Sequence, residues 1–170
     1  MRKIILFIAS SLDGFITGEN GELDWLFTDQ DYGYTKFLSS TDCALMGRKT
    51  YETAIKLGDS PKEGRKWYVF THSSEQNKEN ITFISDLVPF TKKLRQQKGK
   101  NIWLIGGSEA ISILMNAGLV DEIIISIHPI LLGKGIPLFK NIGKIINLKL
   151  VKSTKFNSGL LQLHYLVERN

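Results

Sequence analysis

The 170-residue chain is poor in cysteine: Cys43 stands alone, so no disulfide can form within the chain. Proteins without disulfides are typical of a reducing compartment. Apolar runs are also short, and none approaches the roughly 20 residues that a helix needs to cross a bilayer. The run 4–9 is too brief for the core of a secretory signal. These absences exclude a disulfide-stabilised secreted scaffold, and we expect a cytoplasmic protein that does not associate with membranes.

Histidine is scarce as well, and His72, His128 and His164 are too dispersed to show the spacing of metal ligands. We therefore expect no metal. The chain lacks the G-x-S-x-G nucleophile elbow, the G-x-G-x-x-G dinucleotide fingerprint and the Walker G-x-x-x-x-G-K-S/T motif. Cys43 lies in an apolar run, where a cysteine is more often a small core residue than a nucleophile. A nucleotide that binds this chain needs another kind of motif.

Positive charge is in excess, with a net charge of +5 and a pI of about 9.3. The lysines and arginines are scattered and form no long basic run, so we expect no nucleic-acid partner. An anionic small molecule fits this charge. The hydrophobic share of 42% is ordinary for a globular protein. No repeat and no Pro/Gly/Ser-rich linker divides the chain, which predicts a single domain over residues 1–170.

The order of the predicted elements changes towards the C-terminus. Strands are expected at 2–9, 43–46, 66–71, 81–84 and 102–105, with helices at 29–40, 48–57, 85–97 and 108–117. Strands at 122–130, 146–156 and 160–168 follow without helices between them, and Asn157-Ser158-Gly159 predicts a hairpin turn. This order is typical of an α/β fold. We expect a central, mostly parallel mixed sheet of about eight strands, with helices on both faces and an antiparallel C-terminal hairpin.

Two of the strand-to-helix turns carry glycine: Gly106-Gly107 and Met46-Gly47-Arg48-Lys49-Thr50. Glycine lets the backbone approach a ligand closely, and the first turn of a helix presents unpaired N–H groups that favour anions. Cations at a helix N-terminus are unfavourable unless an anion lies nearby. The two motifs together indicate a phosphate-bearing nucleotide. The alternatives are a tight turn that binds nothing and, for Arg48, a contact with Glu52 or with solvent.

A third strand end carries Thr71-His72-Ser73-Ser74, whose hydroxyl and backbone groups could hold another phosphate. Ordinary capping of a loop by Ser and Thr is the alternative. Acidic residues follow the long first loop, where Asp29 and Asp31 begin a predicted helix. Such residues usually complement the helix dipole. One of them in a cleft could instead hold or protonate a heterocycle.

Five stretches, taken in order, carry a resemblance to a known family. They are Ser11–Ile16, Leu45–Glu52, Ile105–Gly107, Val120–Glu122 and the late loop Pro129–Gly135 with Pro137–Phe139. In this order they resemble the dihydrofolate reductase-like superfamily. The match is to the branch that contains the reductase domain of riboflavin-biosynthesis enzymes, the RibD C-terminal domain, here as a stand-alone member.

The resemblance implies that the cofactor is NADPH. It implies that Ala9 and Ile16 line the nicotinamide and that the Gly47 turn holds the diphosphate and approaches the 2′-phosphate. It also implies a catalytic carboxylate in the first helix, for which Asp31 is our candidate; an alignment on Phe37 instead puts Gly33 at that place. The implied cofactor-binding residues are Ala9, Ile16, Gly47, Arg48, Lys49, Thr50, Thr71, His72, Ser73, Gly106, Gly107, Ser108, Glu109 and Ala110.

The function implied is an NADPH-dependent reductase that transfers hydride to a small heterocycle. The candidate substrates are 5-amino-6-(5-phosphoribosylamino)uracil and a dihydropterin, and a nucleotide-binding module without catalysis is the alternative. The resemblance also implies a homodimer. Leu160, Leu166 and Ile124 support it, because they stay apolar after the alternation of their strands is accounted for. A helix of the same chain could cover them instead.

Overall fold

The computed structural model describes residues 1–61 and 64–169. The described elements follow one another in this order: β1 (Ile4–Ser11), β2 (Phe15–Thr17), α1 (Tyr34–Ser39), β3 (Thr41–Gly47), α2 (Arg48–Lys56), β4 (Lys66–Phe70), β5 (Ile81–Ile84), α3 (Leu87–Leu94), β6 (Asn101–Gly106), α4 (Ser108–Asn116), β7 (Glu122–His128), β8 (Ile136–Pro137), β9 (Leu148–Lys155) and β10 (Leu161–Val167).

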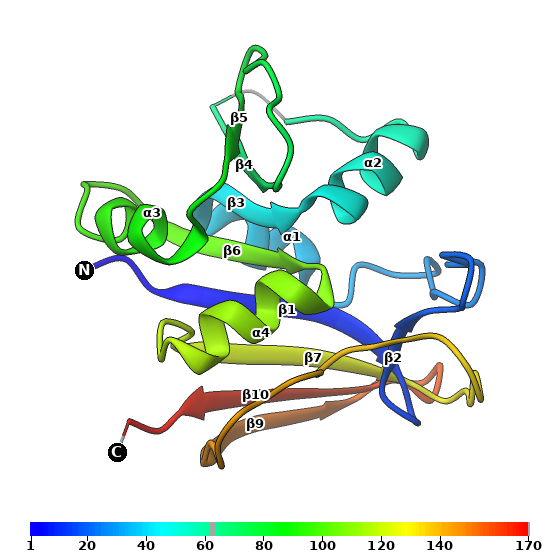
Figure 1. Ribbon diagram of the computed structural model, residues 1–170. Coiled ribbons are helices and arrows are strands. Elements are labelled where there is room, and N and C mark those ends of the chain that lie inside the picture. Colours follow the sequence, from blue (N-terminus) through cyan, green and yellow to red (C-terminus); the bar gives the residue numbers. More distant parts are fainter. Residues whose placement is uncertain (62–63, 170) are drawn as a thin grey trace.

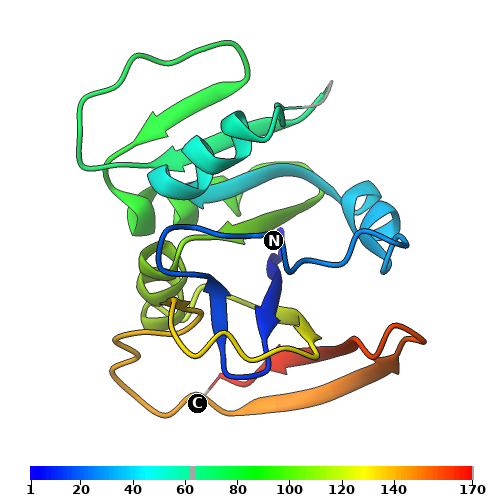
Figure 2. The ribbon, with the colours of Figure 1, turned by 90° about the vertical axis from the view of Figure 1, so that its right-hand side faces the viewer.

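An eight-stranded sheet in the order β5-β4-β3-β6-β1-β7-β10-β9 forms the centre of the molecule (Figure 1). The pairs from β5 to β7 are all parallel, whereas β10 runs antiparallel to both of its neighbours, β7 and β9. The predicted mixed sheet with an antiparallel hairpin at its C-terminal edge is therefore confirmed. Figure 2 shows this hairpin at the edge of the sheet opposite β5.

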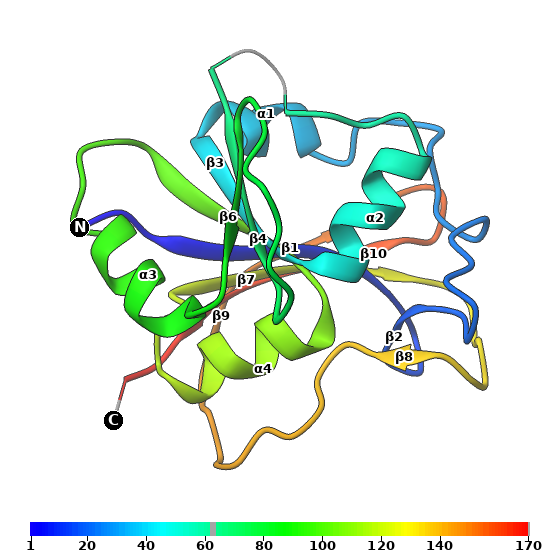
Figure 3. The same ribbon diagram turned by 45° about the horizontal axis from the view of Figure 1, so that its top comes forward.

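Helices cover both faces of the sheet, as Figure 3 shows. The larger core lies under α3 and α4, where Leu45, Leu104 and Ile111 are fully buried. On the other face, Tyr51 of α2 packs edge-on against Phe83, and Phe37 of α1 stacks on Phe7 of β1 with ring centres 4.3 Å apart. The strands alternate between the two cores, as a sheet buried on both faces requires. None of the helices in the described ranges is long and apolar enough to cross a membrane.

The first helix is shorter than the predicted helix 29–40, because the backbone before it is left-handed. Tyr32 has φ 50° and Gly33 has φ 79°, so neither can continue a right-handed helix. α1 therefore begins only at Tyr34, and residues 29–33 lead into it as a loop. Glycine adopts this conformation without strain, but Tyr32 does so at a cost that its surroundings must offset.

The long first loop and the late loop hold a second sheet that the sequence did not predict. β2 and β8 pair antiparallel through Phe15–Pro137 and Thr17–Ile136, and Figure 3 shows them side by side away from the main sheet. Gly135 makes the approach possible, since a Cβ at this position would lie 2.1 Å from the carbonyl oxygen of Thr17. The pairing joins two segments that are 120 residues apart in the chain.

The C-terminal edge bears out only part of the pattern predicted for it. Leu160, just before β10, is buried within the single chain, so for this residue the alternative of cover by the same chain holds and no second copy is needed. Leu166 is exposed and Ile124 is half-buried. β9 is exposed along nearly its whole length, and its outer side has no neighbouring strand among the described residues.

Candidate functional site

The two glycine turns of the sequence meet at one edge of the sheet. β3 and β6 are parallel neighbours, and Met46 pairs with Gly106 where both strands end. A Cβ on Gly47 would lie 3.9 Å from the Cα of Gly107, and a Cβ on Gly107 would lie 3.3 Å from Oγ1 of Thr50. Gly107 has φ 57°, a left-handed value that favours glycine. The two turns are therefore in contact, and the conformation of Gly107 is the feature that calls for glycine.

Each of these turns opens a helix, and the two helices lie on opposite faces of the sheet. Gly47 caps α2 and Gly107 caps α4, and neither cap position makes a side-chain hydrogen bond. Adjacent parallel strands whose helices leave to opposite faces form a switch point, where α/β proteins bind ligands beyond the carboxyl ends of the strands. The free N–H groups and the positive ends of two helix dipoles lie together here, which suits a diphosphate.

The cations of the Gly47 turn lie on the outer side of this edge. Arg48 Nε donates to Glu52 Oε1 at 2.8 Å, and Arg48 Nη1 lies 3.0 Å from Glu75 Oε1. The pKa of Arg48 is raised by these carboxylates, Glu52 foremost. The contact with Glu52 is the alternative that the sequence left open. An incoming phosphate would have to share the guanidinium with Glu52 and Glu75, while Lys49 is exposed beside it.

The third strand end also reaches this edge, next to α4. His72 Nε2 lies 3.1 Å from Glu109 Oε1, which joins the end of β4 to the first turn of α4. Thr71 is buried, and its hydroxyl accepts from the Ser73 N–H at 3.1 Å. The structure thus brings the three predicted phosphate-binding segments together.

The side chains of two residues at the start of α4 have structural roles. The buried Ser108 donates its hydroxyl to the carbonyl of Pro137 in β8, and Ala110 is a fully buried core residue. Only their backbone groups are free to meet a ligand. The side chains of these two residues therefore serve the fold, and their backbone is the part available to the candidate site.

The second part of the candidate site is the sheet face beside α1. Ala9 of β1 pairs in register with Ser126 of β7, and Ser126 pairs with Gln162 of β10. Ala9 is half-buried, and Ile8 beside it lies 3.3 Å from the position of a Cβ on Gly106. Ile16, the other residue expected near a nicotinamide, packs against the larger core from β2. The row Ala9–Ser126–Gln162 thus crosses three neighbouring strands, β1, β7 and β10, on one face of the sheet.

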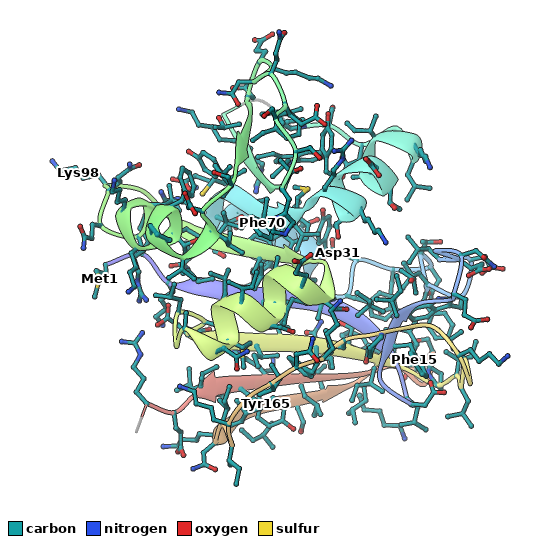
Figure 4. All side chains as sticks on the ribbon, viewed as in Figure 1. Met1, Phe15, Asp31, Phe70, Lys98 and Tyr165 are labelled. Carbon is teal, nitrogen blue, oxygen red and sulfur yellow. The ribbon has the colours of Figure 1, made fainter. Side chains whose placement is uncertain are left out.

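Asp31 is exposed and lies in the loop that precedes α1 (Figure 4). Its Oδ1 accepts from the Thr35 hydroxyl at 2.5 Å and from the Thr35 N–H at 3.0 Å. These bonds, the hydroxyl first, lower the pKa of the Asp31 carboxyl. The carboxylate caps the first turn of α1, the role that acidic residues at helix starts commonly have. Its predicted part in catalysis stays a prediction.

Asp13 joins two motifs that are far apart in the sequence, the one that begins at Ser11 and the late glycine loop. Its carboxylate accepts from the Gly133 N–H at 2.8 Å, the Leu132 N–H at 3.2 Å and the Ser11 hydroxyl at 2.6 Å. The pKa of Asp13 is lowered, mainly by the bond from Ser11. The hydrogen bonds of the Asp13 carboxylate therefore hold the late glycine loop against the loop that follows β1, at this edge of the sheet.

His128 holds the first long loop on the sheet, and sequence reasoning missed this role. The residue is 3% exposed at the end of β7, and its ring lies edge-on to Trp25 and Phe27, with ring centres 5.1 and 5.0 Å away. Nε2 accepts from the Phe27 N–H at 3.2 Å, and Nδ1 lies 3.2 Å from the carbonyl of Ser126. Accepting with one nitrogen and donating with the other requires the neutral ring. Burial accordingly lowers the pKa of His128.

Comparison with known proteins matches residues 60–162 to the family described as the RibD C-terminal domain. The uncharacterized protein YyaP of Bacillus subtilis strain 168 is 41% identical, over 96% of this chain and 94% of its own length. A candidate riboflavin biosynthesis protein of Shewanella sp. PV-4 has a similar structure, with a TM-score of 0.87, 28% identity, and coverage of 98% of this chain and 99% of that one.

A dihydrofolate reductase of Enterococcus faecalis, solved with NADP(H) and the compound RAB-propyl, shares the fold at lower sequence similarity. Its TM-score is 0.73 at 18% identity, and the match covers 98% of this chain and 97% of that chain. The dihydrofolate reductase-like fold expected from the sequence is thereby confirmed.

We predict that His128 makes the protein less stable in mild acid. A pKa lowered in the folded state means that the neutral ring contributes stability above about pH 6.5, and this contribution is lost as the pH falls through the folded-state pKa. Between pH 7.5 and 5.5, the melting temperature of the wild type should fall by roughly 2–4 °C more than that of His128→Gln. The exposed His72→Gln variant is the control and should follow the wild type. Equal falls in the wild type and His128→Gln would contradict the assignment.

Proposed function

The chain belongs to the RibD C-terminal domain family, and from this premise we propose that it is an NADPH-dependent reductase acting on a small heterocycle. The observation that carries the proposal is the contact between the Gly47 and Gly107 turns, which aims two uncapped helix starts at one place. Single glycine turns are common in strand–helix connections. Two in contact at a switch point fit a dinucleotide diphosphate. The proposal treats residues 1–170 as one such domain in a reducing, cytoplasmic compartment, in keeping with the single buried cysteine.

The residues present fit the cofactor. Backbone N–H groups of 47–50 and 106–110 would hold the diphosphate, and Arg48, Lys49 and the 71–73 segment would surround the 2′-phosphate that distinguishes NADPH from NADH. Ala9 and Ile16 would face the nicotinamide. NADPH, when bound, supplies the hydride, and the protein orients the reactants and excludes water. The Enterococcus reductase, solved with NADP(H), shares this fold and supports the assignment.

The substrate is reduced on the sheet face that runs from Ala9 towards Gln162. The loop that His128 and Asp13 hold in place lies at the same edge and shields the reacting atoms from water. A 5-amino-6-(5-phosphoribosylamino)uracil and a dihydropterin are the two candidates. Asp31 is our candidate for contacting the heterocycle. Its low pKa keeps it ionised at neutral pH, so it would accept an N–H of the substrate rather than donate a proton.

A reductase assay tests the proposal. The purified protein is incubated with NADPH and each of the two substrates, and the loss of NADPH absorbance is followed. Turnover of either substrate supports a reductase and identifies its class, and inhibition by trimethoprim would favour the pterin. Tight NADPH binding without turnover of either substrate would support the non-catalytic module and reject the enzyme.

We predict that Arg48→Ala weakens NADPH binding by about 10- to 100-fold and NADH binding by far less, because one charge-assisted hydrogen bond to a phosphate is lost. Dissociation constants from the quenching of protein fluorescence give the measurement. Lys56→Ala, in the last turn of the same helix, is the matched control and should bind both cofactors normally. Small and equal losses for both cofactors in Arg48→Ala would place Arg48 outside the site.

We also propose that two copies associate through the β9–β10 edge. Leu148, Leu150 and Val151 are exposed on β9, and Leu166 is exposed on β10. A β-edge with exposed apolar side chains favours pairing with another chain, and the resemblance to the riboflavin-type branch implies a homodimer. Each copy would cover the edge of the other.

We predict that Leu150→Glu converts a dimer into a monomer, because it places a charge among apolar side chains that the second copy buries. Light scattering at micromolar concentration should give twice the chain mass for the wild type and the chain mass for the variant. Leu57→Glu introduces the same charge at an exposed leucine beyond α2 and should stay dimeric. A monomeric wild type would reject the proposed assembly.

A further inference from the structure

Ser126 and Gln162 form a hydrogen-bonded polar pair next to Ala9 on one face of the sheet. Ser126 is only 7% exposed, and Gln162 is half-buried beside it. Gln162 Nε2 donates to Ser126 Oγ at 3.0 Å and to the carbonyl of Tyr32 at 3.0 Å. Buried polar groups of this kind need partners, so the bonds that each atom makes can be accounted for one by one.

The carbonyl of Tyr32 determines how the Gln162 amide is oriented. A backbone carbonyl can only accept, so the atom facing it must be the NH₂ group. That group uses both of its hydrogens, one on Tyr32 and one on Ser126. The Ser126 oxygen is therefore an acceptor in this pair, and its own hydrogen points elsewhere. The orientation follows from chemistry and does not depend on choosing between two similar amide atoms.

Two groups of the pair are left available. Within residues 1–61 and 64–169, no hydrogen bond is formed by the Ser126 hydrogen or by the Gln162 side-chain oxygen. One donor and one acceptor thus stand side by side, next to the strand position at which the nicotinamide is expected. A lactam, a ring C=O adjacent to a ring N–H, offers the complementary acceptor and donor.

We propose that Ser126 and Gln162 determine substrate specificity by reading the lactam edge of a neutral heterocycle. The inference rests on the proposed reductase function and deepens it. The Ser126 hydroxyl donates to the ring carbonyl, and the Gln162 oxygen accepts from the ring N–H. Tyr32, in a strained left-handed conformation, holds the amide in this orientation. Its hydroxyl is fixed in turn by Asp29 at 2.6 Å and Ser158 at 2.8 Å.

Two small probes test the pair: 5,6-diaminouracil, which has ring N–H groups, and its 1,3-dimethyl derivative, which has none. The wild type should prefer the unmethylated probe by about 10-fold or more, the scale of one hydrogen bond to a buried group. Gln162→Met keeps the size of the side chain but cannot accept, so it should lose this preference. Ser126→Ala should weaken both probes by similar factors, because both retain the ring carbonyls.

Control variants distinguish a loss of ligand recognition from a disturbance of the fold. Ser126→Ala leaves the Gln162–Tyr32 bond intact, so its effect does not come from releasing the loop. Tyr32→Phe removes the bonds to Asp29 and Ser158 but keeps the carbonyl, and it should retain the wild-type preference. Melting curves of all variants confirm that they are folded.

The inference is overturned by any of three results. The preference persists in Gln162→Met, the wild type shows no preference, or the wild type binds neither probe. The measurements are made with and without NADPH. A wild type that fails to bind NADPH but shows the preference refutes the proposed cofactor and retains the pair, so the two failures are distinguishable.

Discussion

The contact between the Gly47 and Gly107 turns is the constraint on which the rest of the structure depends. It requires β3 and β6 to be parallel neighbours that end at the same level, and it requires their helices to leave towards opposite faces. A side chain at Gly107 would be strained in its left-handed conformation and would crowd the Thr50 hydroxyl. The two cores, one under each pair of helices, follow from this divergence. The candidate site is therefore produced by the strand order itself, and its side chains adjust the chemistry of an edge that backbone geometry creates.

Most of the fold could be predicted because it rests on local patterns. Continuous apolar runs such as Ile4–Ala9 marked strands buried on both faces, and glycine marked where they end. The first helix was predicted too long because a tyrosine, which normally avoids the left-handed region, adopts it at position 32. Gln162 Nε2 donates to the Tyr32 carbonyl, and the Tyr32 hydroxyl donates to Ser158 Oγ. These tertiary bonds stabilise that conformation, and no local rule registers them. β2 and β8 were missed because strands of three and two residues have no periodicity to detect.

In the candidate site, too, local patterns could be predicted from the sequence and tertiary contacts could not. The three predicted phosphate-binding segments were identified from their residue types and from their positions directly after strands, and the structure brings them together. Asp13, His128, Ser126 and Gln162 were not recognised as partners, because their roles depend on register. The alternation in the last strand puts Gln162 on one face, but only the pairing of β10 with β7 sets it beside Ser126. A one-residue slip would place a leucine there. Acidic residues before α1 were flagged for chemistry, and the structure shows Asp31 capping a helix as well.

The exposed strand β9 has a consequence for how the protein behaves at high concentration. An open edge of eight residues is a template on which further strands could add without limit. Lys149, Lys152 and Lys155 are distributed along it, and strands added to this edge would bring like charges together. Lysines on an exposed edge strand oppose its pairing with further chains and so make polymerisation into fibres unfavourable. Neutralising these lysines, for instance by acetylation, would remove this repulsion and leave the edge more prone to aggregation.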